Sequence, residues 1–263
     1  MPARLDEILS STRLRLPALQ DQRIALERRI QGSHVTRPSF RAALLRPTVA
    51  VIAELKRRSP SAGSIREDLD PGSRSALYAR NGAAAISVLT DGPFFGGSVQ
   101  DLRAVADSSP LPILRKDFIL DEVQVLEARA AGASAVLLIV RILGEARLQE
   151  LLRYSAELGL DALVEVHTAA ELAIALHSDA EIVGVNSRDL DTFDIDVGSA
   201  LKLLARVPGD RVGVAESGIV GQSDVTRAAE AGADAVLVGT ALSASESPEE
   251  LLRGLCSVPR HGR

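Results

Sequence analysis

Several charged side chains in this 263-residue sequence stand at the ends of short apolar runs, where proton-transfer chemistry could use them. Glu54 and Lys56 are two residues apart, so in an extended strand they lie on the same face. Lys116, Glu165 and Glu216 close, or lie within, later runs of the same kind. Carboxylates and amines act as general bases and acids when their surroundings tune their pKa values. The sequence therefore indicates acid-base chemistry if the fold brings these groups together.

Lysine is scarce in this sequence. Of the 30 basic residues, only Lys56, Lys116 and Lys202 are lysines. An arginine stays protonated, whereas a lysine can release its proton when its pKa is lowered. A compositional preference for arginine explains the count, but two of the three lysines also fall at ends of apolar runs. That placement favours a functional role for Lys56 and Lys116.

Eight apolar runs rich in β-branched residues predict parallel strands buried on both faces. The runs are 49–54, 84–89, 112–116, 135–140, 162–166, 182–186, 212–216 and 235–239, and helix-period segments such as 145–158 separate them. A Gly-Ala-x-Ala pattern at Gly82, Gly132 and Gly232 recurs at multiples of one strand-helix unit of roughly 25 residues. This alternation predicts an α/β fold, a (β/α)₈ TIM barrel. A doubly wound open sheet is the alternative, weakened because no G-x-G-x-x-G follows the first strand.

Residues 1–48 lie outside the repeat and form a predicted N-terminal helical extension. The spacing of apolar residues in this extension predicts two amphipathic helices with a break near Pro17. The apolar residues are Leu5, Ile8, Leu9, Ile24, Leu26 and Ile30. We expect the extension to cover one end of the barrel, with substrate binding as the alternative role. Residues 1–263 are then a single barrel domain.

Composition narrows the class of protein. Hydrophobic residues at 46%, charged residues at 25% and a net charge of -5 are ordinary for a soluble globular protein and argue against nucleic-acid or membrane partners. The charged N-terminus lacks a signal-peptide core, which predicts a cytoplasmic protein. The lone Cys256 excludes an internal disulfide, and no residue spacing resembles a metal site. Monomer and homodimer both remain open.

In a (β/α)₈ barrel, the C-terminal strand ends and the loops after them build the active site. Glu54, Lys56, Lys116, Glu165, Asn186, Arg188 and Glu216 would converge on this mouth. Ser217, Gly218, Gly239 and Thr240 follow the last two strands, the usual phosphate position of such barrels. Phe94, Phe95, Phe118 and Phe193 also follow strands, where they could hold a planar apolar ligand or merely pack loops. His167 shares a strand face with Glu165, but we expect it in a loop rather than in catalysis.

Several longer segments resemble the indole-3-glycerol phosphate synthase family. They are 54–61, 94–98, 114–118, 163–167, 184–190, 215–218 and 238–239, and the similarity runs in order from about residue 1 to 255. The resemblance implies a step of tryptophan biosynthesis. In it, 1-(2-carboxyphenylamino)-1-deoxyribulose 5-phosphate closes to an indole with loss of carbon dioxide and water. No metal or organic cofactor is implied.

The resemblance also implies roles for single residues. Lys116 would be the acid for ring closure and Glu165 would transfer a proton in the dehydration, with Glu54 and Lys56 paired nearby. Lys56 would hold a carboxylate or the phosphate, or act as a second acid. The sugar would be bound, and the ring positioned, by Asn186, Arg188 and Glu216. The anthranilate pocket would be lined by Ser61, Phe94 and Phe118. The phosphate would be held by Ser217, Gly218, Gly239 and Thr240. Ser187 stands where the family often has a second Asn, and little effect is expected.

Two other functions compete with this one. A different phosphate-binding barrel lyase, such as a Schiff-base aldolase, would use Lys116 or Lys56 as its nucleophile. A barrel without catalysis could bind phosphorylated ligands as a regulator, but the retained set of charged strand ends disfavours that reading.

Overall fold

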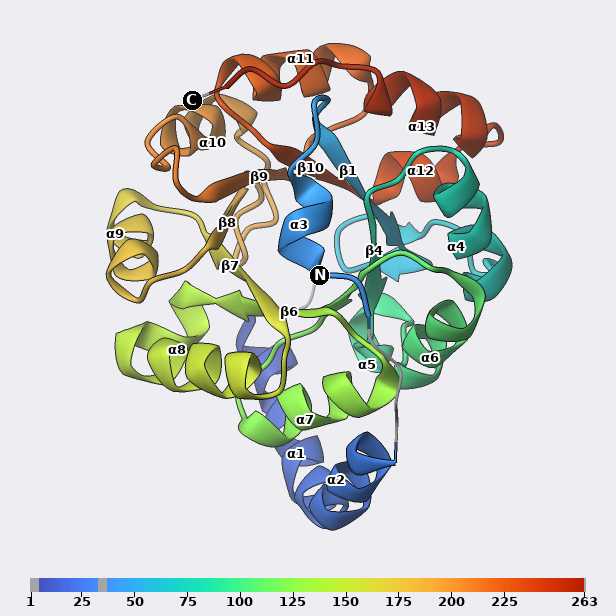
Figure 1. Ribbon diagram of the computed structural model, residues 1–263, viewed down its shortest axis with the longest axis vertical. Coiled ribbons are helices and arrows are strands. Elements are labelled where there is room, and N and C mark those ends of the chain that lie inside the picture. Colours follow the sequence, from blue (N-terminus) through green and yellow to red (C-terminus); the bar gives the residue numbers. More distant parts are fainter. Residues whose placement is uncertain (1–4, 33–36, 263) are drawn as a thin grey trace.

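The structure, a computed structural model describing residues 5–32 and 37–262, is built on a closed ring of eight parallel strands (Figure 1). The strands are β1 (Ala50–Leu55), β4 (Ala85–Leu89), β5 (Ile113–Lys116), β6 (Ala135–Ile139), β7 (Asp161–Val166), β8 (Ile182–Asn186), β9 (Val212–Glu216) and β10 (Ala235–Val238). They neighbour one another in chain order, and β10 closes the ring on β1. The (β/α)₈ barrel is confirmed and the open sheet was the wrong alternative. Each predicted strand is present with both ends within one residue.

Helices surround the ring of strands (Figure 1). They are α4 (Pro71–Arg80), α5 (Gly92–Phe95), α6 (Val99–Ser108), α7 (Glu122–Ala131), α8 (Val140–Glu157), α9 (Ala169–His177), α10 (Val197–Leu204), α11 (Gln222–Glu230), α12 (Thr240–Ala244) and α13 (Pro248–Cys256). Local chemistry sets their ends: the Asp121 side chain caps α7, and Gly132 ends it with a left-handed φ of 95°. The predicted helix 145–158 is the part of α8 that follows a non-helical Gly144. None of the described helices is long and apolar enough to cross a membrane.

The loop after β1 contains a small antiparallel hairpin that the sequence patterns did not predict. It consists of β2 (Arg58–Ser59) and β3 (Gly63–Ser64), and β3 begins directly after the turn, at Gly63, which has φ 66°. Strands of two residues are too short to show an apolar period, so no hydrophobic signal was available.

The barrel interior is filled by aliphatic side chains, and its N-terminal end is closed by α3 (Phe40–Leu44). This helix lies over the middle of the strand ring in Figure 1. Phe40 and Leu44 are fully buried and belong to the same apolar cluster as the inward-facing Ala50 and Ile52 of β1. This last helix of the extension therefore covers one end of the barrel. With that end filled, the inward-facing polar residues collect at the opposite end.

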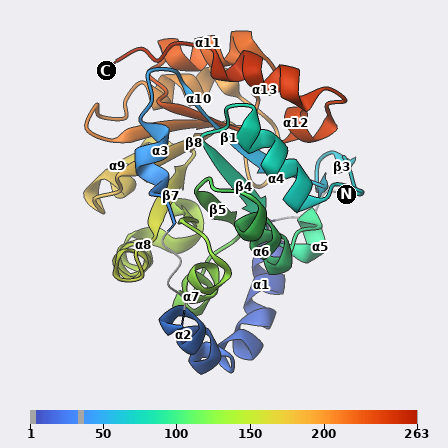
Figure 2. The same cartoon turned by 45° about the vertical axis from the view of Figure 1, so that its right-hand side comes forward.

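The helices α1 (Leu5–Gln20) and α2 (Arg23–Gln31) form a hairpin that packs against α7 at the side of the barrel (Figures 1 and 2). The predicted break at Pro17 is wrong, because Pro17 lies inside α1 and the chain turns at Asp21 and Gln22. A proline removes one backbone donor, and the residues on either side of Pro17, Leu16 and Leu19, pack against a buried apolar cluster shared by α2 and α7. Ile24, expected on the buried face of the second helix, is mostly exposed.

Candidate active site

A pocket of about 820 Å³, partly open to solvent, lies at the C-terminal ends of the strands. It brings together most of the predicted site residues: Glu54, Lys56, Ser61, Lys116, Phe118, Glu165, Asn186, Arg188, Glu216 and Ser217. They come from strands all around the ring, so only the closed barrel makes them neighbours. Within the described residues, no group of three or more His, Cys, Asp or Glu side chains is placed to hold a metal ion.

Four predicted residues are not among those lining this pocket. Phe94 lies beside it in α5, and the neighbouring Phe95 supplies the ring on the wall. Gly218, with φ 73°, follows the pocket residue Ser217, and Thr240 begins α12. Gly239 packs against Glu54, and a Cβ atom there would collide with the Glu54 carboxylate. Its missing side chain therefore makes room for an acid, a purpose that the sequence reasoning did not foresee.

Lys116 lies between two buried carboxylates at the end of β5. Its Nζ atom is 3.1 Å from Oε2 of Glu165 and 3.4 Å from Oε2 of Glu216. Burial by itself would lower the pKa of Lys116, but the attraction of Glu165, Glu216 and Glu54 outweighs it and raises that pKa. The pocket therefore holds Lys116 as a protonated amine.

The two carboxylates beside Lys116 differ in ionisation. Burial, together with the charge of Glu165, outweighs the attraction of Lys116 and raises the pKa of Glu216 to about 8. Burial also acts on Glu165, but the attraction of Lys116 and then His167 prevails and lowers its pKa. Near neutral pH the cluster thus contains a carboxylate on Glu165 and a largely protonated Glu216. Gly184 leaves the space that Glu216 occupies, because a Cβ atom there would collide with its carboxyl group.

Glu54 and Lys56 face the pocket together, as their spacing predicts. Oε1 of Glu54 is 3.7 Å from Nζ of Lys56, and Oε2 accepts a hydrogen bond from Ser87 at 3.3 Å. Burial lowers the pKa of Lys56; Glu54 opposes this, while Arg188 and Lys116 reinforce it. The pKa values of the two pocket lysines are therefore shifted in opposite directions, and Lys56 releases its proton more readily than Lys116. Pairs of groups tuned apart in this way are typical of acid-base sites.

Arg188 connects two loops across the mouth of the pocket. Its Nη1 atom donates hydrogen bonds of 3.0 Å to the Ser61 hydroxyl, after β1, and to the Phe193 carbonyl, after β8. Its backbone N–H donates to the Asn186 side chain at 3.0 Å. The guanidinium is thus fixed at the rim, where it can contact an anionic group of a ligand.

The rest of the pocket wall is apolar and partly unforeseen. The rings of Phe95 and Phe118 lie 6.2 Å apart with a tilt of 37°. Leu5 and Ile8 bring α1 to the wall, which gives the extension a place in the pocket as well as the end-covering role. Their spacing indicated a buried helix face, but nothing in the sequence says what that face packs against.

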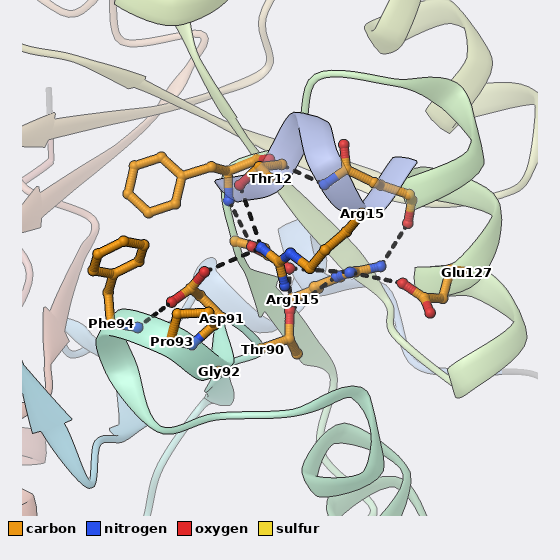
Figure 3. A network of polar contacts seen from close by, with 12 residues as sticks. Thr12, Arg15, Thr90, Asp91, Gly92, Pro93, Phe94, Arg115 and Glu127 are labelled. Carbon is orange, nitrogen blue, oxygen red and sulfur yellow. Dashed lines mark hydrogen bonds and ion pairs between the residues drawn. The ribbon is translucent and has the colours of Figure 1, made fainter. Parts of the chain in front are cut away.

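A second polar network, missed by the sequence reasoning, extends behind the pocket wall (Figure 3), and two of its residues, Asp91 and Asp117, are themselves part of that wall. Oδ2 of Asp91 accepts a hydrogen bond of 3.1 Å from Arg15 of α1, and Oδ1 accepts one of 2.8 Å from the Phe94 backbone. Arg115, next to Lys116 on β5, is buried and pairs with Asp117 at 3.0 Å. These contacts join α1, the start of α5 and β5 behind the pocket.

Fold and site together define a (β/α)₈-barrel enzyme with an acid-base cluster at its C-terminal mouth. The family model described as indole-3-glycerol phosphate synthase matches residues 5–255. The chain belongs to the indole-3-glycerol phosphate synthase family.

Individual relatives agree with this assignment, and a solved structure agrees with the fold. An indole-3-glycerol phosphate synthase of Parafrankia sp. is 45% identical over 260 residues, covering 98% of this chain and 96% of the relative. One of Dehalococcoides mccartyi (strain CBDB1) is 53% identical over 200 residues, covering 75% and 77%. A solved 3-hexulose-6-phosphate synthase superposes with a TM-score of 0.64 at 14% identity, covering 80% of this chain and 99% of that one. At that identity the likeness shows the fold alone.

Proposed function

We propose that this pocket converts 1-(2-carboxyphenylamino)-1-deoxyribulose 5-phosphate to indole-3-glycerol phosphate, with release of carbon dioxide and water. The observation that carries the proposal is a lysine, Lys116, held protonated between Glu165 and Glu216 in a pocket with aromatic walls. A fixed ammonium of this kind can protonate a sugar carbonyl. The aromatic walls suit the flat anthranilate part of the substrate.

Ring closure is the first step. Lys116 gives a proton to the carbonyl oxygen of the sugar while the ring carbon that carries the carboxylate attacks the carbonyl carbon. The new carbon–carbon bond leaves a hydroxyl on the former carbonyl carbon and a positive charge shared with the nitrogen. The bond to the carboxylate then breaks, carbon dioxide leaves, and its electron pair neutralises that charge. This internal electron sink explains how decarboxylation proceeds without an organic cofactor.

Dehydration is the second step. Glu165, kept ionised beside Lys116, takes a proton from the methylene carbon that lies between the nitrogen and the former carbonyl carbon. The hydroxyl leaves as water after protonation by the Lys56 ammonium group, or by Lys116 after it has taken up the proton that Glu165 removed. The double bond that forms completes the indole. Glu54 holds Lys56 near this position through their 3.7 Å contact.

Substrate binding is assigned to the remaining residues. Arg188 and Lys56 face the anionic carboxylate, and Phe118 with Ser61 borders the anthranilate ring. Asn186 and Glu216 contact the sugar hydroxyls. Phe94 supports the ring pocket from α5, while Ser217, Gly218, Gly239 and Thr240 surround the phosphate. Ser217 adopts φ 65°, a conformation rare outside glycine that suits a functional turn.

We place this activity in the cytoplasm, in a single-domain enzyme that is a monomer or a homodimer. The substrate is a small phosphorylated molecule, and none of the assigned roles requires a nucleic acid, a membrane or a metal ion.

The deciding experiment is incubation with synthetic substrate while indole fluorescence is followed. The chain contains no tryptophan, so the background is low. Release of indole-3-glycerol phosphate and carbon dioxide in equal amounts is the expected result. Borohydride added with substrate tests the aldolase alternative. A stable adduct on Lys116 or Lys56, with no indole formed, would replace the synthase by a Schiff-base enzyme.

A further inference from the structure

Glu165 has a second cationic neighbour besides Lys116. While its Oε2 atom contacts Lys116, its Oε1 atom faces Nε2 of His167 at 3.5 Å. The His167 side chain is only 6% exposed and is not part of the pocket wall. It therefore lies behind Glu165, where it touches the carboxylate but not a bound substrate.

The other side of the imidazole faces a second carboxylate. Nδ1 of His167 is 3.3 Å from Oε2 of Glu171, and the same oxygen accepts the His167 backbone N–H at 2.7 Å. Glu171 is itself held by Arg141, whose Nε atom is 3.6 Å from Oε1. Nε2 is buried without a hydrogen-bond partner among the described residues and lies only at ion-pair distance from Glu165. An imidazole with a carboxylate near each nitrogen favours the form in which both nitrogens carry protons.

We propose that His167 is a positioning residue for the catalytic base: held by Glu171, its imidazolium orients Glu165 and keeps it ionised. This inference rests on the proposed role of Glu165 in dehydration. The charged groups facing the imidazole are Glu165 on β7, Glu171 on α9 and, through Glu171, Arg141 on α8. Burial opposes the charged imidazole, but Glu171 and Glu165 outweigh it, and the pKa of His167 is raised.

The geometry predicts a specific change in the pH profile. Without the imidazolium, Glu165 loses one of its two cationic neighbours, so it becomes protonated at a higher pH. In His167→Asn, the acidic limb of kcat/KM should move up by about 1 pH unit, because an opposite charge at this distance shifts a pKa by that order. Glu171→Gln should move the limb in the same direction by less. KM on the alkaline side of the limb should change little.

The test combines kinetics with a readout that needs no activity. The pH profiles of wild type, His167→Asn and Glu171→Gln are compared with His177→Asn, which removes an exposed histidine of the same helix region and should change nothing. Histidine-labelled NMR of wild type should show that the imidazole signal missing from His167→Asn titrates above the ordinary pKa of histidine, and Glu171→Gln should lower that pKa.

The outcomes separate the inference from the function on which it rests. An active wild type whose acidic limb is unmoved in His167→Asn overturns the inference and leaves the synthase in place. An inactive wild type with the elevated imidazole titration overturns the proposed function while the electrostatic coupling stands. Equal losses at every pH in His167→Asn would mean a purely structural role and also overturn the inference.

Discussion

Strand β5 carries two buried ionic clusters on opposite faces, one from Arg115 and one from the next residue, Lys116. Arg115 points away from the barrel axis into the network of Figure 3, whereas Lys116 points into the pocket. Both side chains are cations buried among carboxylates. The two clusters differ in how completely their polar atoms are paired, and that difference separates a structural cluster from a reactive one.

The Arg115 cluster is saturated with hydrogen bonds and ion pairs. Its guanidinium reaches Thr90 Oγ1 at 3.0 Å, the Gln124 carbonyl at 2.7 Å, Asp117 at 3.0 Å and Glu127 at 2.8 Å. In the Lys116 cluster, by contrast, Oε2 of Glu216 has an ion-pair contact of 3.4 Å with Lys116, but neither carboxyl oxygen has a hydrogen-bond partner among the described residues. Unmet pairing of this kind is costly for stability, and it leaves atoms free for a substrate.

The largest expected effect comes from the reactive cluster. Lys116→Arg keeps the positive charge but cannot release a proton, so kcat should fall by roughly 10²- to 10⁴-fold, the usual contribution of a general acid. Thermal stability should change far less than activity. Lys202→Arg, on the outer helix α10, is the matched control and should retain full activity. Turnover near the wild-type value in Lys116→Arg would remove Lys116 from the acid role.

The saturated cluster should respond in the opposite way. Arg115→Met leaves the buried Asp117 without its cation, so the free energy of unfolding should fall by about 3–5 kcal/mol. Urea unfolding measures this loss. Arg153→Met removes an exposed cation 4.0 Å from Glu157 and should change stability by less than about 0.5 kcal/mol. If the two variants were equally stable, the saturated network would have no structural role.

Glu216, in the reactive cluster, should make the stability of the folded protein depend on pH. An unfolded glutamate releases its proton near 4.5, whereas folded Glu216 holds it to about 8. Between these values the native state binds more protons, so its stability falls as pH rises through this window. Glu165, whose pKa is lowered, titrates below the window, and Lys116, whose pKa is raised, titrates above it.

Glu216→Gln removes this dependence. Relative to wild type, the variant should gain several kcal/mol in free energy of unfolding, up to about 5, between the acidic and alkaline ends of the window, because each pKa unit between 4.5 and about 8 corresponds to about 1.4 kcal/mol. Urea titrations at several pH values measure the difference, and the contribution of His167 cancels between the two proteins. Glu230→Gln, at an exposed position of α11, should follow wild type. Parallel stability curves for wild type and Glu216→Gln would show that Glu216 is ionised throughout.

The sequence predicted the reactive cluster far better than the saturated one, for a physical reason. Strand ends are visible as the last residues of apolar runs, and barrel topology alone brings Glu54, Lys116 and Glu165 to one mouth. The partners of Arg115 come from a loop, a strand end and α7, and no period in the chain joins them. Arg115 itself reads as an interruption of an apolar run.

The wrong predictions for single site residues have a similar cause, because they too depend on contacts between separate segments of the chain. Phe94 and Phe95 are adjacent, and only the turn of the short helix α5 decides which ring lines the pocket. Gly239 was expected at the phosphate and Gly184 had no assigned role, yet each leaves space for a carboxyl group from a neighbouring strand. Strand register decides which side chains contact one another across the barrel. The sequence of a single strand does not determine that register.

The smallest effect should arise at the salt bridge between Arg15 and Asp91, where the polar network of Figure 3 borders the pocket. Arg15 is 43% exposed and Asp91 is buried, so solvent weakens the pair, and Arg15→Ala should destabilise the protein by only about 1 kcal/mol. Asp91 also caps α5, next to the pocket ring Phe95, and Arg15 belongs to the helix whose Leu5 and Ile8 line the same pocket. Loosening both walls should raise KM several-fold and leave kcat nearly unchanged.

Arg13→Ala, an exposed position on the same helix, is the control for this variant and should leave KM unchanged. Asp91→Asn tests the other side of the bond, because it keeps a polar side chain but removes the charge that Arg15 pairs with. If the bond transmits the effect, adding Arg15→Ala to Asp91→Asn should raise KM less than Arg15→Ala does alone. Fully additive changes in KM would mean that α1 and α5 shape the pocket independently, and that the network behind the wall supports the fold without tuning the site.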